Sequence, residues 1–298
     1  MKKIIISENE AEQRLDRFLT KYLNATTRSN IFKMIRKKVF KVNGVRVKED
    51  YFLKLGDELE IFLADETLEG LIREEEIPRP DRLGLDIVYE DASLLILNKP
   101  KGMLTHPDKD EYKNTLATSV QFYLKALCTR TFRPAPIHRL DKNTSGLVVF
   151  AKTYEALKKY NELMRDRAIE KYYLCVVEGH IDQPGEVKGY LVKDPERNKV
   201  TLYKWDSDDS KFCHTKYKPI QHLSHHTVLE VELLTGRSHQ IRASLAWIGH
   251  PIVGDVKYGG QKTNAINAQL LHSYRMVLEG VSYSAPSSEI DAFIKMNP

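Results

Sequence analysis

Apolar residues in the first part of the chain recur at two different spacings. Residues 12–23 and 28–38 each carry them at the spacing of an amphipathic helix. Residues 39–47, VFKVNGVRV, instead alternate on either side of Asn43-Gly44, the residue pair that a type I′ hairpin turn favours. The pattern therefore predicts a small module within residues 1–64, made of two helices followed by a hairpin.

A segment without sustained periodicity comes next. From Asp65 to Asp91 there are ten acidic residues against three arginines, and prolines stand at positions 78 and 80. Such a sequence is typical of a connection between domains. We therefore interpret residues 65–84 as an acidic linker.

Periodic segments return after residue 84 and predict a second, larger domain over residues 85–298. Strands are expected at 85–89, 94–97, 147–150, 170–179 and up to Leu234, and helices at 114–127, 153–167 and 238–248. Residues 185–226 have the pattern of hairpins with a polar connection. The last periodic run, LLHSYRMVL, is expected to close the sheet.

Composition narrows the class of protein. The chain has 298 residues, which suits two domains, and no apolar run is long enough to span a bilayer. The isoleucine run of MKKIIISENE is too short for a signal peptide, so a cytoplasmic protein is expected. The three cysteines are too widely spaced for a disulfide framework. The histidines between 214 and 226 lack a metal-ligand spacing, so no metal is expected.

Positive charge is concentrated in the predicted small module. Eight basic residues and no acidic residue lie between Arg28 and Lys48, although the net charge of the chain is only +5. Isolated lysines would be solvated, but a helix and a hairpin that share one sign of charge favour a phosphate-rich partner. The candidate RNA contacts are Arg28, Lys33, Arg36, Lys37, Lys41 and Arg46.

A polar turn followed by an apolar run marks the candidate site. Residues 147–150 predict a strand buried on both faces, and residues 138–145 before it are almost all polar. Asp141 is the only carboxylate of this turn, and the flanking Arg139 and Lys142 favour its ionised form. An anionic Asp on a rigid support can act as a nucleophile, although an Asx turn would use the same residue.

The whole string HRLDKNTSGLVVFAK resembles the HRLDxxTSG signature of the RluA-type pseudouridine synthases of large-subunit rRNA. The resemblance implies that Asp141 is the catalytic nucleophile and that Arg139 occupies the space of a flipped-out nucleotide. It also implies an α+β fold whose large domain is built on a mixed, mostly antiparallel sheet flanked by helices. The implied enzyme is a monomer without a cofactor, and it acts on RNA, with large-subunit rRNA favoured over tRNA.

Two more stretches carry the same resemblance. NKPKGMLTHP matches the NKPxGxxxHP motif and is expected to bring Lys99 and His106 toward the site as candidate RNA contacts. EKYYLCVVEG matches a KxY motif on a strand, which places Lys171 and Tyr173 on one face, with Lys171 as a further candidate RNA contact. In the family this tyrosine stacks on the target base and accepts a proton, while Tyr172 is expected to be structural.

The block TGRSHQIR resembles the family's TGRxHQIR motif. It implies that Arg242 pairs with Asp141 and that Arg237 contacts the RNA backbone. The chain departs from the family at Ala243-Ser244, where a Val-His pair is common. In the small module, the order of helix, basic helix, VNG hairpin, Tyr51 and GDELEIF resembles the S4-type RNA-binding domain over about residues 12–62.

Other classes of function fit less well. A glycosidase would need a second carboxylate near Asp141, and none stands in the matched motifs. A Ser-His-Asp hydrolase built from Ser145, His138 and Asp141 lacks a GxSxG elbow, and no dinucleotide or P-loop motif is present. A non-catalytic RNA-binding or ribosome-assembly factor stays open, and so does the choice between attack on the ribose and attack on the uracil.

Overall fold

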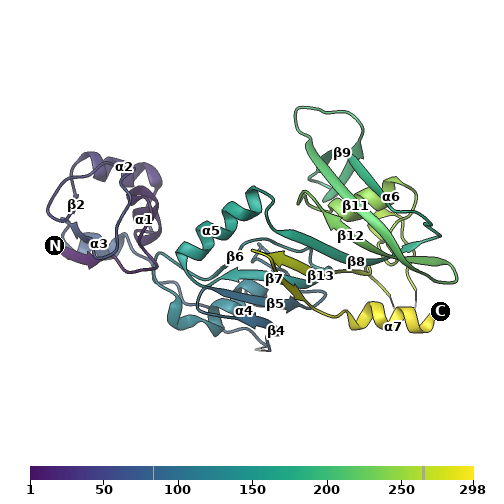
Figure 1. The fold of residues 1–298 in the computed structure, drawn as a ribbon. Helices are drawn as coiled ribbons and strands as arrows, with labels where there is room; N and C mark the ends of the chain where they lie inside the picture. The colour runs from purple at the N-terminus through teal and green to yellow at the C-terminus, as the bar shows by residue number, and fades with distance from the viewer. Residues whose placement is uncertain (83, 264–265) are drawn as a thin grey trace.

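The computed structural model describes residues 1–298 except 83 and 264–265, and it has a small and a large lobe (Figure 1). The small lobe contains β1 (Lys2–Ile5), α1 (Leu15–Tyr22), α2 (Arg28–Arg36), β2 (Phe40–Val42), β3 (Glu58–Ile61) and α3 (Asp65–Gly70). Its strands form an antiparallel sheet in the order β1-β3-β2. The two amphipathic helices bury their apolar faces, including Phe18, Leu19 and Ile31, in a core that belongs to this lobe alone.

The small lobe differs from the predicted pattern in two places. Asn43 and Gly44 have φ of 51° and 75°, as a type I′ turn requires, but only the first arm of the hairpin is a strand. The second arm makes a single bridge, from Val45 to Val42, and β2 pairs with β3 instead. Residues 65–70 are helical, and Leu68 joins the small lobe's core. Helix α3 was not predicted from the sequence, because it buries only one side chain, that of Leu68, and so has no apolar periodicity.

Within the described residues, the large lobe is built on one 11-stranded sheet. Its strands are β4 (Ile87–Glu90), β5 (Leu94–Lys99), β6 (Ala135–Pro136), β7 (Ser145–Ala151), β8 (Glu170–Glu178), β9 (Gly185–Asp194), β10 (Lys199–Tyr203), β11 (Lys211–His222), β12 (His226–Leu233), β13 (Leu271–Leu278) and β14 (Val281–Ser284). Its helices are α4 (Leu116–Tyr123), α5 (Tyr154–Arg165), α6 (Gln240–Trp247) and α7 (Ser288–Met296), with short 3-10 turns at Lys125–Leu127 and Val256–Tyr258. The β7–β13 pair is parallel and most others are antiparallel. The predicted α+β class and mixed sheet are confirmed.

Strand β7 is buried on both faces, as its apolar run predicts. Leu147 and Val149 face a core shared with α5, whereas Val148 and Phe150 face the larger core shared with α4, α6 and α7. Helix α5 begins where predicted, because the side chain of Thr153 accepts a hydrogen bond from the backbone N–H of Ala156. The turn that carries Asp141 therefore precedes one of the best-anchored strands of the molecule.

Strand β13 lies in the middle of the sheet, between β8 and β7, rather than at an edge. Its contact with β7 depends on Gly146, which pairs with Ser273. A Cβ atom on Gly146 would lie 2.2 Å from the carbonyl oxygen of Ser273, and the φ of Gly146 is +110°. Only glycine fits there, because any side chain would push the two backbones apart.

The acidic segment binds the large lobe as well as leading to it. Arg130 Nη2 lies 2.6 Å from Glu74 Oε1, and Arg133 Nη2 lies 3.3 Å from Glu75 Oε2. Thr131 Oγ1 also donates to Glu10 Oε1 at 3.2 Å. These contacts join the two lobes. The limits 1–64, 65–84 and 85–298 stay predictions for the domains. No helix in the described ranges is long and apolar enough to cross a membrane.

Candidate active site

A cleft of about 310 Å³ opens where the turn before β7, strand β8 and the start of α6 meet. This volume is at the lower end of the range for ligand pockets, about 300–1,000 Å³. The lining includes six of the residues that the sequence singled out: Arg139, Asp141, Lys171, Tyr173, Arg237 and Arg242. The fold therefore brings together motifs that are up to about a hundred residues apart in the chain.

Asp141 and Arg242 form the predicted ion pair, and Arg242 also binds a second carboxylate, that of Asp255. Arg242 Nη1 lies 3.2 Å from Asp141 Oδ2, while Arg242 Nε and Nη2 donate to the two carboxylate oxygens of Asp255 at 2.6 and 2.8 Å. Asp255 is only 2% exposed. Burial alone would lower the pKa of Arg242, but the bonds and charge of Asp255, with the charge of Asp141, raise it. The guanidinium therefore stays charged and fixed beside Asp141.

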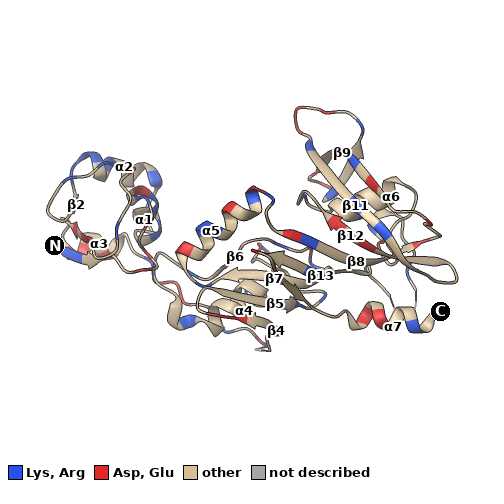
Figure 2. Ribbon diagram, viewed as in Figure 1, with Lys and Arg blue, Asp and Glu red and all other residues tan. Residues whose placement is uncertain are grey.

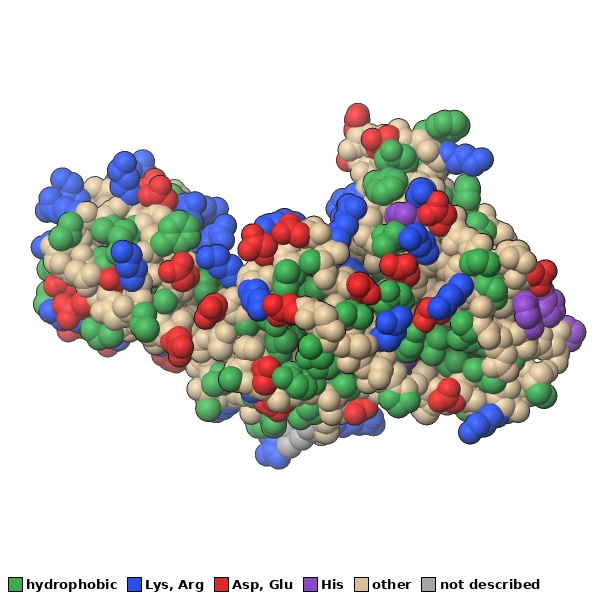
Figure 3. Space-filling view, in the orientation of Figure 1, with side chains coloured by type: hydrophobic (Ala, Val, Ile, Leu, Met, Phe, Trp, Pro, Cys, Tyr) green, Lys and Arg blue, Asp and Glu red, His purple; other side chains and the backbone are tan. Residues whose placement is uncertain are grey.

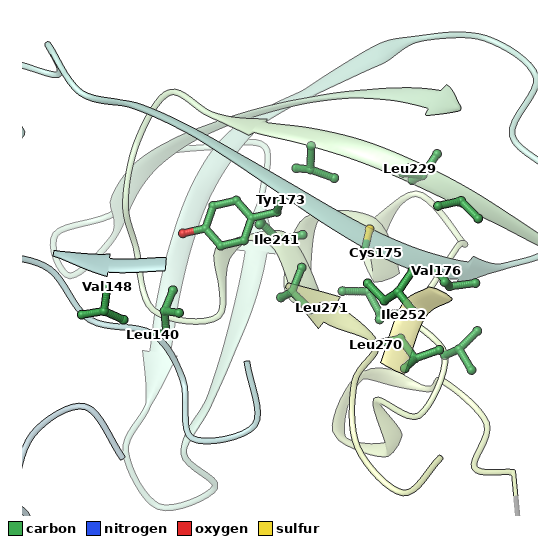
Figure 4. Close-up of a cluster of buried hydrophobic side chains, with 14 of the residues drawn as sticks. Leu140, Val148, Tyr173, Cys175, Val176, Leu229, Ile241, Ile252, Leu270 and Leu271 are labelled. Carbon is green, nitrogen blue, oxygen red and sulfur yellow. The ribbon is translucent and has the colours of Figure 1, made fainter. Parts of the chain in front are cut away.

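Tyr173 and Lys171 enter the cleft from the same face of β8, as alternation along a strand predicts. Figure 4 shows the ring of Tyr173 beside Ile241, with its hydroxyl pointing toward the side of Leu140 and Val148. Burial raises the pKa of Tyr173, so its phenol is protonated at neutral pH. Stacking on the base and acceptance of a proton both stay predictions for Tyr173.

Comparison with known proteins identifies the family. Residues 93–247 match the profile of the RNA pseudouridylate synthases, and residues 13–59 match that of the S4 domain. This chain is a member of the RNA pseudouridine synthase family. The alternative of a non-catalytic RNA-binding factor is thereby set aside.

Relatives of similar length support the assignment. The chain is 31% identical to an uncharacterised RNA pseudouridine synthase of Bacillus subtilis, covering 91% of this chain and 87% of the relative. It is 30% identical to the ribosomal large subunit pseudouridine synthase C of Vibrio cholerae (96% and 90% covered) and 34% identical to the synthase D of Escherichia coli K12 (86% and 76% covered). Human RNA pseudouridylate synthase domain containing 4 shares the fold, with a TM-score of 0.57 at 21% identity over 70% of this chain and 90% of that chain.

Lys99 is placed differently from the prediction for this pseudouridine synthase. Its side chain is fully buried, and Nζ donates to the carbonyl oxygens of Pro100, Met103 and Lys142 at 3.0, 2.8 and 3.2 Å. An ammonium enclosed in this way cannot contact RNA, so that role is corrected. Because Lys142 follows Asp141 directly, Lys99 instead fastens the catalytic turn to the loop after β5. His106 is exposed outside the cleft lining, near the charge of Arg139.

The buried Lys99 should leave a signature in the pH dependence of stability. Burial lowers its pKa to about 7, from 10.5 for a free side chain. Between these two pKa values, Lys99 is protonated in the unfolded chain and largely neutral in the folded protein. The contribution of Lys99 to the free energy of unfolding therefore rises with pH. We expect the stability of the wild type relative to Lys99→Met to increase from pH 7 to pH 10, by up to about 1.4 kcal/mol per pH unit.

Urea denaturation at three pH values across this window measures the effect. The matched control is Lys109→Met, which removes an exposed lysine near the same loop. Its stability difference from the wild type should not change with pH. A Lys99→Met difference that is equally flat would show that Lys99 keeps its ordinary pKa.

Basic residues of the S4 domain occupy α2 and the backbone beside it (Figure 2), and Figure 3 shows basic side chains on the surface of the small lobe over this region. The exposed ones among the candidates are Arg28, Lys33, Arg36, Lys37 and Arg46. Lys41 is half-buried, with Nζ 4.9 Å from the ring centre of Phe62. In the large lobe, Arg139 and Arg237 are exposed at the cleft. All of these stay candidate RNA contacts.

The departure from the family at residues 243–244 concerns packing. Ser244 is fully buried, and its Oγ lies 3.3 Å from Thr215 Oγ1 on β11.

Tyr172 packs against a neighbouring side chain, because the centre of its ring lies 3.7 Å from the guanidinium carbon of Arg275. Neither Tyr172 nor Ser244 lines the cleft.

The hydrolytic alternatives do not fit the geometry. Ser145 Oγ bonds His272 Nδ1 at 2.8 Å rather than His138. His138 Nε2 accepts from the backbone N–H of Val149 at 3.2 Å, and burial lowers the pKa of His138 to about 3. Asp141 is the sole carboxylate among the described cleft-lining residues. The neighbouring Asp255 is not part of the lining, and both of its oxygens are bound by Arg242.

Sequence reasoning missed Asp255, His239 and Tyr258. His239 stands inside the matched block TGRSHQIR and Asp255 ends the run PIVGD, but nothing in their spacing linked them to Asp141. His239 Nε2 lies 3.8 Å from Asp141 Oδ2, and Nδ1 lies 3.0 Å from the hydroxyl of Tyr258. Within the described ranges, no group of three or more His, Cys, Asp or Glu side chains is arranged to hold a metal ion.

Proposed function

We propose that this pseudouridine synthase isomerises specific uridines of large-subunit rRNA, with Asp141 as the nucleophile. The observation that carries the proposal is the Asp141–Arg242 pair at 3.2 Å in a cleft that Tyr173 also lines. The relatives named ribosomal large subunit pseudouridine synthase C and D, which align over most of this chain, favour rRNA as the substrate. A tRNA loop is the second candidate substrate.

Recognition begins with removal of the target uridine from the RNA stack. Neither its glycosidic bond nor C5 is accessible in stacked RNA, and extrusion costs a few kcal/mol, least where the RNA is single-stranded. Arg139 is exposed at the cleft and fills the space that the nucleotide leaves. Tyr173 stacks on the extruded base. Arg237 and the basic surface of the S4 domain hold the backbone, and Lys171, which is 6% exposed but lines the cleft, contacts the extruded nucleotide.

The chemistry moves one bond and exchanges one proton. The bond from C1′ to N1 breaks, a bond from C1′ to C5 forms, C5 loses a proton and N1 gains one. Asp141 supplies an electron pair, either to C1′ of the ribose or to the uracil ring. Arg242 keeps the carboxylate ionised and oriented, and Asp255 keeps Arg242 in place.

The test uses RNA labelled with tritium at C5 of uridine. We expect the protein to release tritium from a large-subunit rRNA transcript, because C5 must lose its hydrogen when it bonds to C1′. Release only from a tRNA transcript would reassign the substrate. The proposed activity would be refuted if tritium were released from neither transcript and also not from total cellular RNA of a strain that lacks the gene.

A further inference from the structure

His239 faces Asp141 in the cleft but has no part in the function proposed above. Its Nε2 lies 3.8 Å from Asp141 Oδ2, and its side chain is only 12% exposed. The residue directly precedes α6 and has a left-handed backbone, with φ of 53° and ψ of 18°. Such a conformation in a non-glycine residue costs free energy and persists where the surroundings hold it, often at functional sites.

The hydroxyl of Tyr258 is placed to hold the proton of a neutral His239 on Nε2. Tyr258 Oη accepts a hydrogen bond from the backbone N–H of Val200 at 2.9 Å and lies 3.0 Å from His239 Nδ1. Burial raises the pKa of Tyr258 to about 12, so the phenol keeps its proton and can donate it to Nδ1. A neutral imidazole that accepts at Nδ1 carries its own hydrogen on Nε2, the nitrogen nearest Asp141.

Burial keeps the imidazole ring of His239 neutral, and the charges around it act in both directions. Burial is the largest effect and lowers the pKa of His239. The cations of Arg242 and Lys257 act in the same direction, whereas the carboxylates of Asp141 and Asp255 oppose them. His239 is therefore an uncharged N–H donor at neutral pH, held in a partly enclosed site.

We propose that His239 is a catalytic residue whose Nε2–H donates a hydrogen bond to a carbonyl oxygen of the uracil as negative charge develops on the base. The inference rests on the proposed function. When the bond from C1′ to N1 breaks, its electron pair spreads over N1 and the carbonyl oxygens. A fixed neutral donor stabilises this charge without losing its own proton, so the proton balance of the isomerisation is unchanged.

Two substitutions of His239 distinguish the contribution of Nε2 from that of Nδ1. The amide nitrogen of Asn reaches about as far as Nδ1 and that of Gln about as far as Nε2, so only His239→Gln keeps an N–H group directed at the base. Asn adopts the left-handed backbone readily, which protects the fold in His239→Asn. We expect His239→Asn to lower kcat about 10²–10³-fold with little change in KM, and His239→Gln to recover most of that loss.

The matched control is His222→Ala, which removes an exposed histidine at the end of β11 that does not line the cleft. Its kcat should equal that of the wild type. Thermal unfolding of each variant shows whether the protein is folded. If His239→Gln is as slow as His239→Asn while both are folded, donation from the Nε2 position is rejected.

A change of leaving group distinguishes donation from packing. Fluorine at C5 withdraws electrons, so the 5-fluorouracil anion leaves more readily and needs less stabilisation. We therefore expect the loss of rate in His239→Asn to be smaller for RNA with 5-fluorouridine at the target, followed as its disappearance from nuclease digests. Equal losses on both substrates would overturn the proposal. A wild-type protein that releases no C5 tritium from uridine would instead overturn the proposed function.

Discussion

Asp141→Asn is expected to abolish pseudouridine formation and to leave RNA binding intact. Asn has nearly the same shape and can still accept a hydrogen bond from Arg242, but a neutral amide is a very weak nucleophile. In enzymes whose catalytic groups act as a unit, loss of the nucleophile costs about 10⁴- to 10⁶-fold in kcat. We expect a loss of at least about 10⁴-fold, with unchanged affinity because the S4 domain and the cleft arginines are untouched.

Tritium release measures the turnover, and a gel-shift titration measures RNA affinity. The control is Asp110→Asn, which neutralises an exposed carboxylate on the loop that leads to α4. The protein must be purified from cells that lack the wild-type gene, since a trace of active enzyme would imitate residual activity. Turnover of Asp141→Asn within a hundredfold of the wild type would remove Asp141 from the role of nucleophile.

Arg242→Met is expected to destabilise the protein as well as inactivate it. Both carboxylate oxygens of Asp255 are bound by Arg242, and Asp255 is 2% exposed. Loss of the guanidinium leaves a buried charge without a partner, which costs about 3–5 kcal/mol. Asp141 also loses the cation that orients it, so any folded variant should be nearly inactive.

A second substitution separates these two effects. In the double variant Arg242→Met with Asp255→Asn, the buried group is neutral, so part of the stability should return while activity stays lost. Urea denaturation gives the stabilities, with Arg237→Met as the control for an exposed arginine of the same loop. A destabilisation of Arg242→Met below about 1 kcal/mol would contradict the argument that the buried Asp255 depends on this guanidinium.

Sequence reasoning recovered the parts of the fold whose periodicity is strong. Strand β7 and helices α1, α2 and α5 occupy nearly the predicted ranges, since each has a clear apolar face or run and α5 has a capping Thr153. The hairpin's second arm was predicted wrongly, because alternation does not specify which strand is the partner. The place of β13 depends on a close approach at Gly146 that no local pattern reveals.

For the site, the sequence motifs located the residues but not their surroundings. Asp141, Tyr173 and Arg242 do line one cleft. Lys99 and Asp255 could not be assigned from the sequence, because a charged residue in a loop is usually solvated. In the structure, Lys99 is fully buried among carbonyl oxygens, and Asp255 has both carboxylate oxygens bound by Arg242. Burial of this kind is a property of the assembled fold.

The central place of β13 has a consequence for synthesis of the protein. Strands β7 and β8, which anchor Asp141 and carry Tyr173, pair with β13 and not with each other. At about 5–20 residues per second, the ribosome makes β13 several seconds after β8. During that interval the nascent chain has two unpaired inner strand edges and no assembled cleft. We therefore expect catalytic competence to appear only after translation of residue 278.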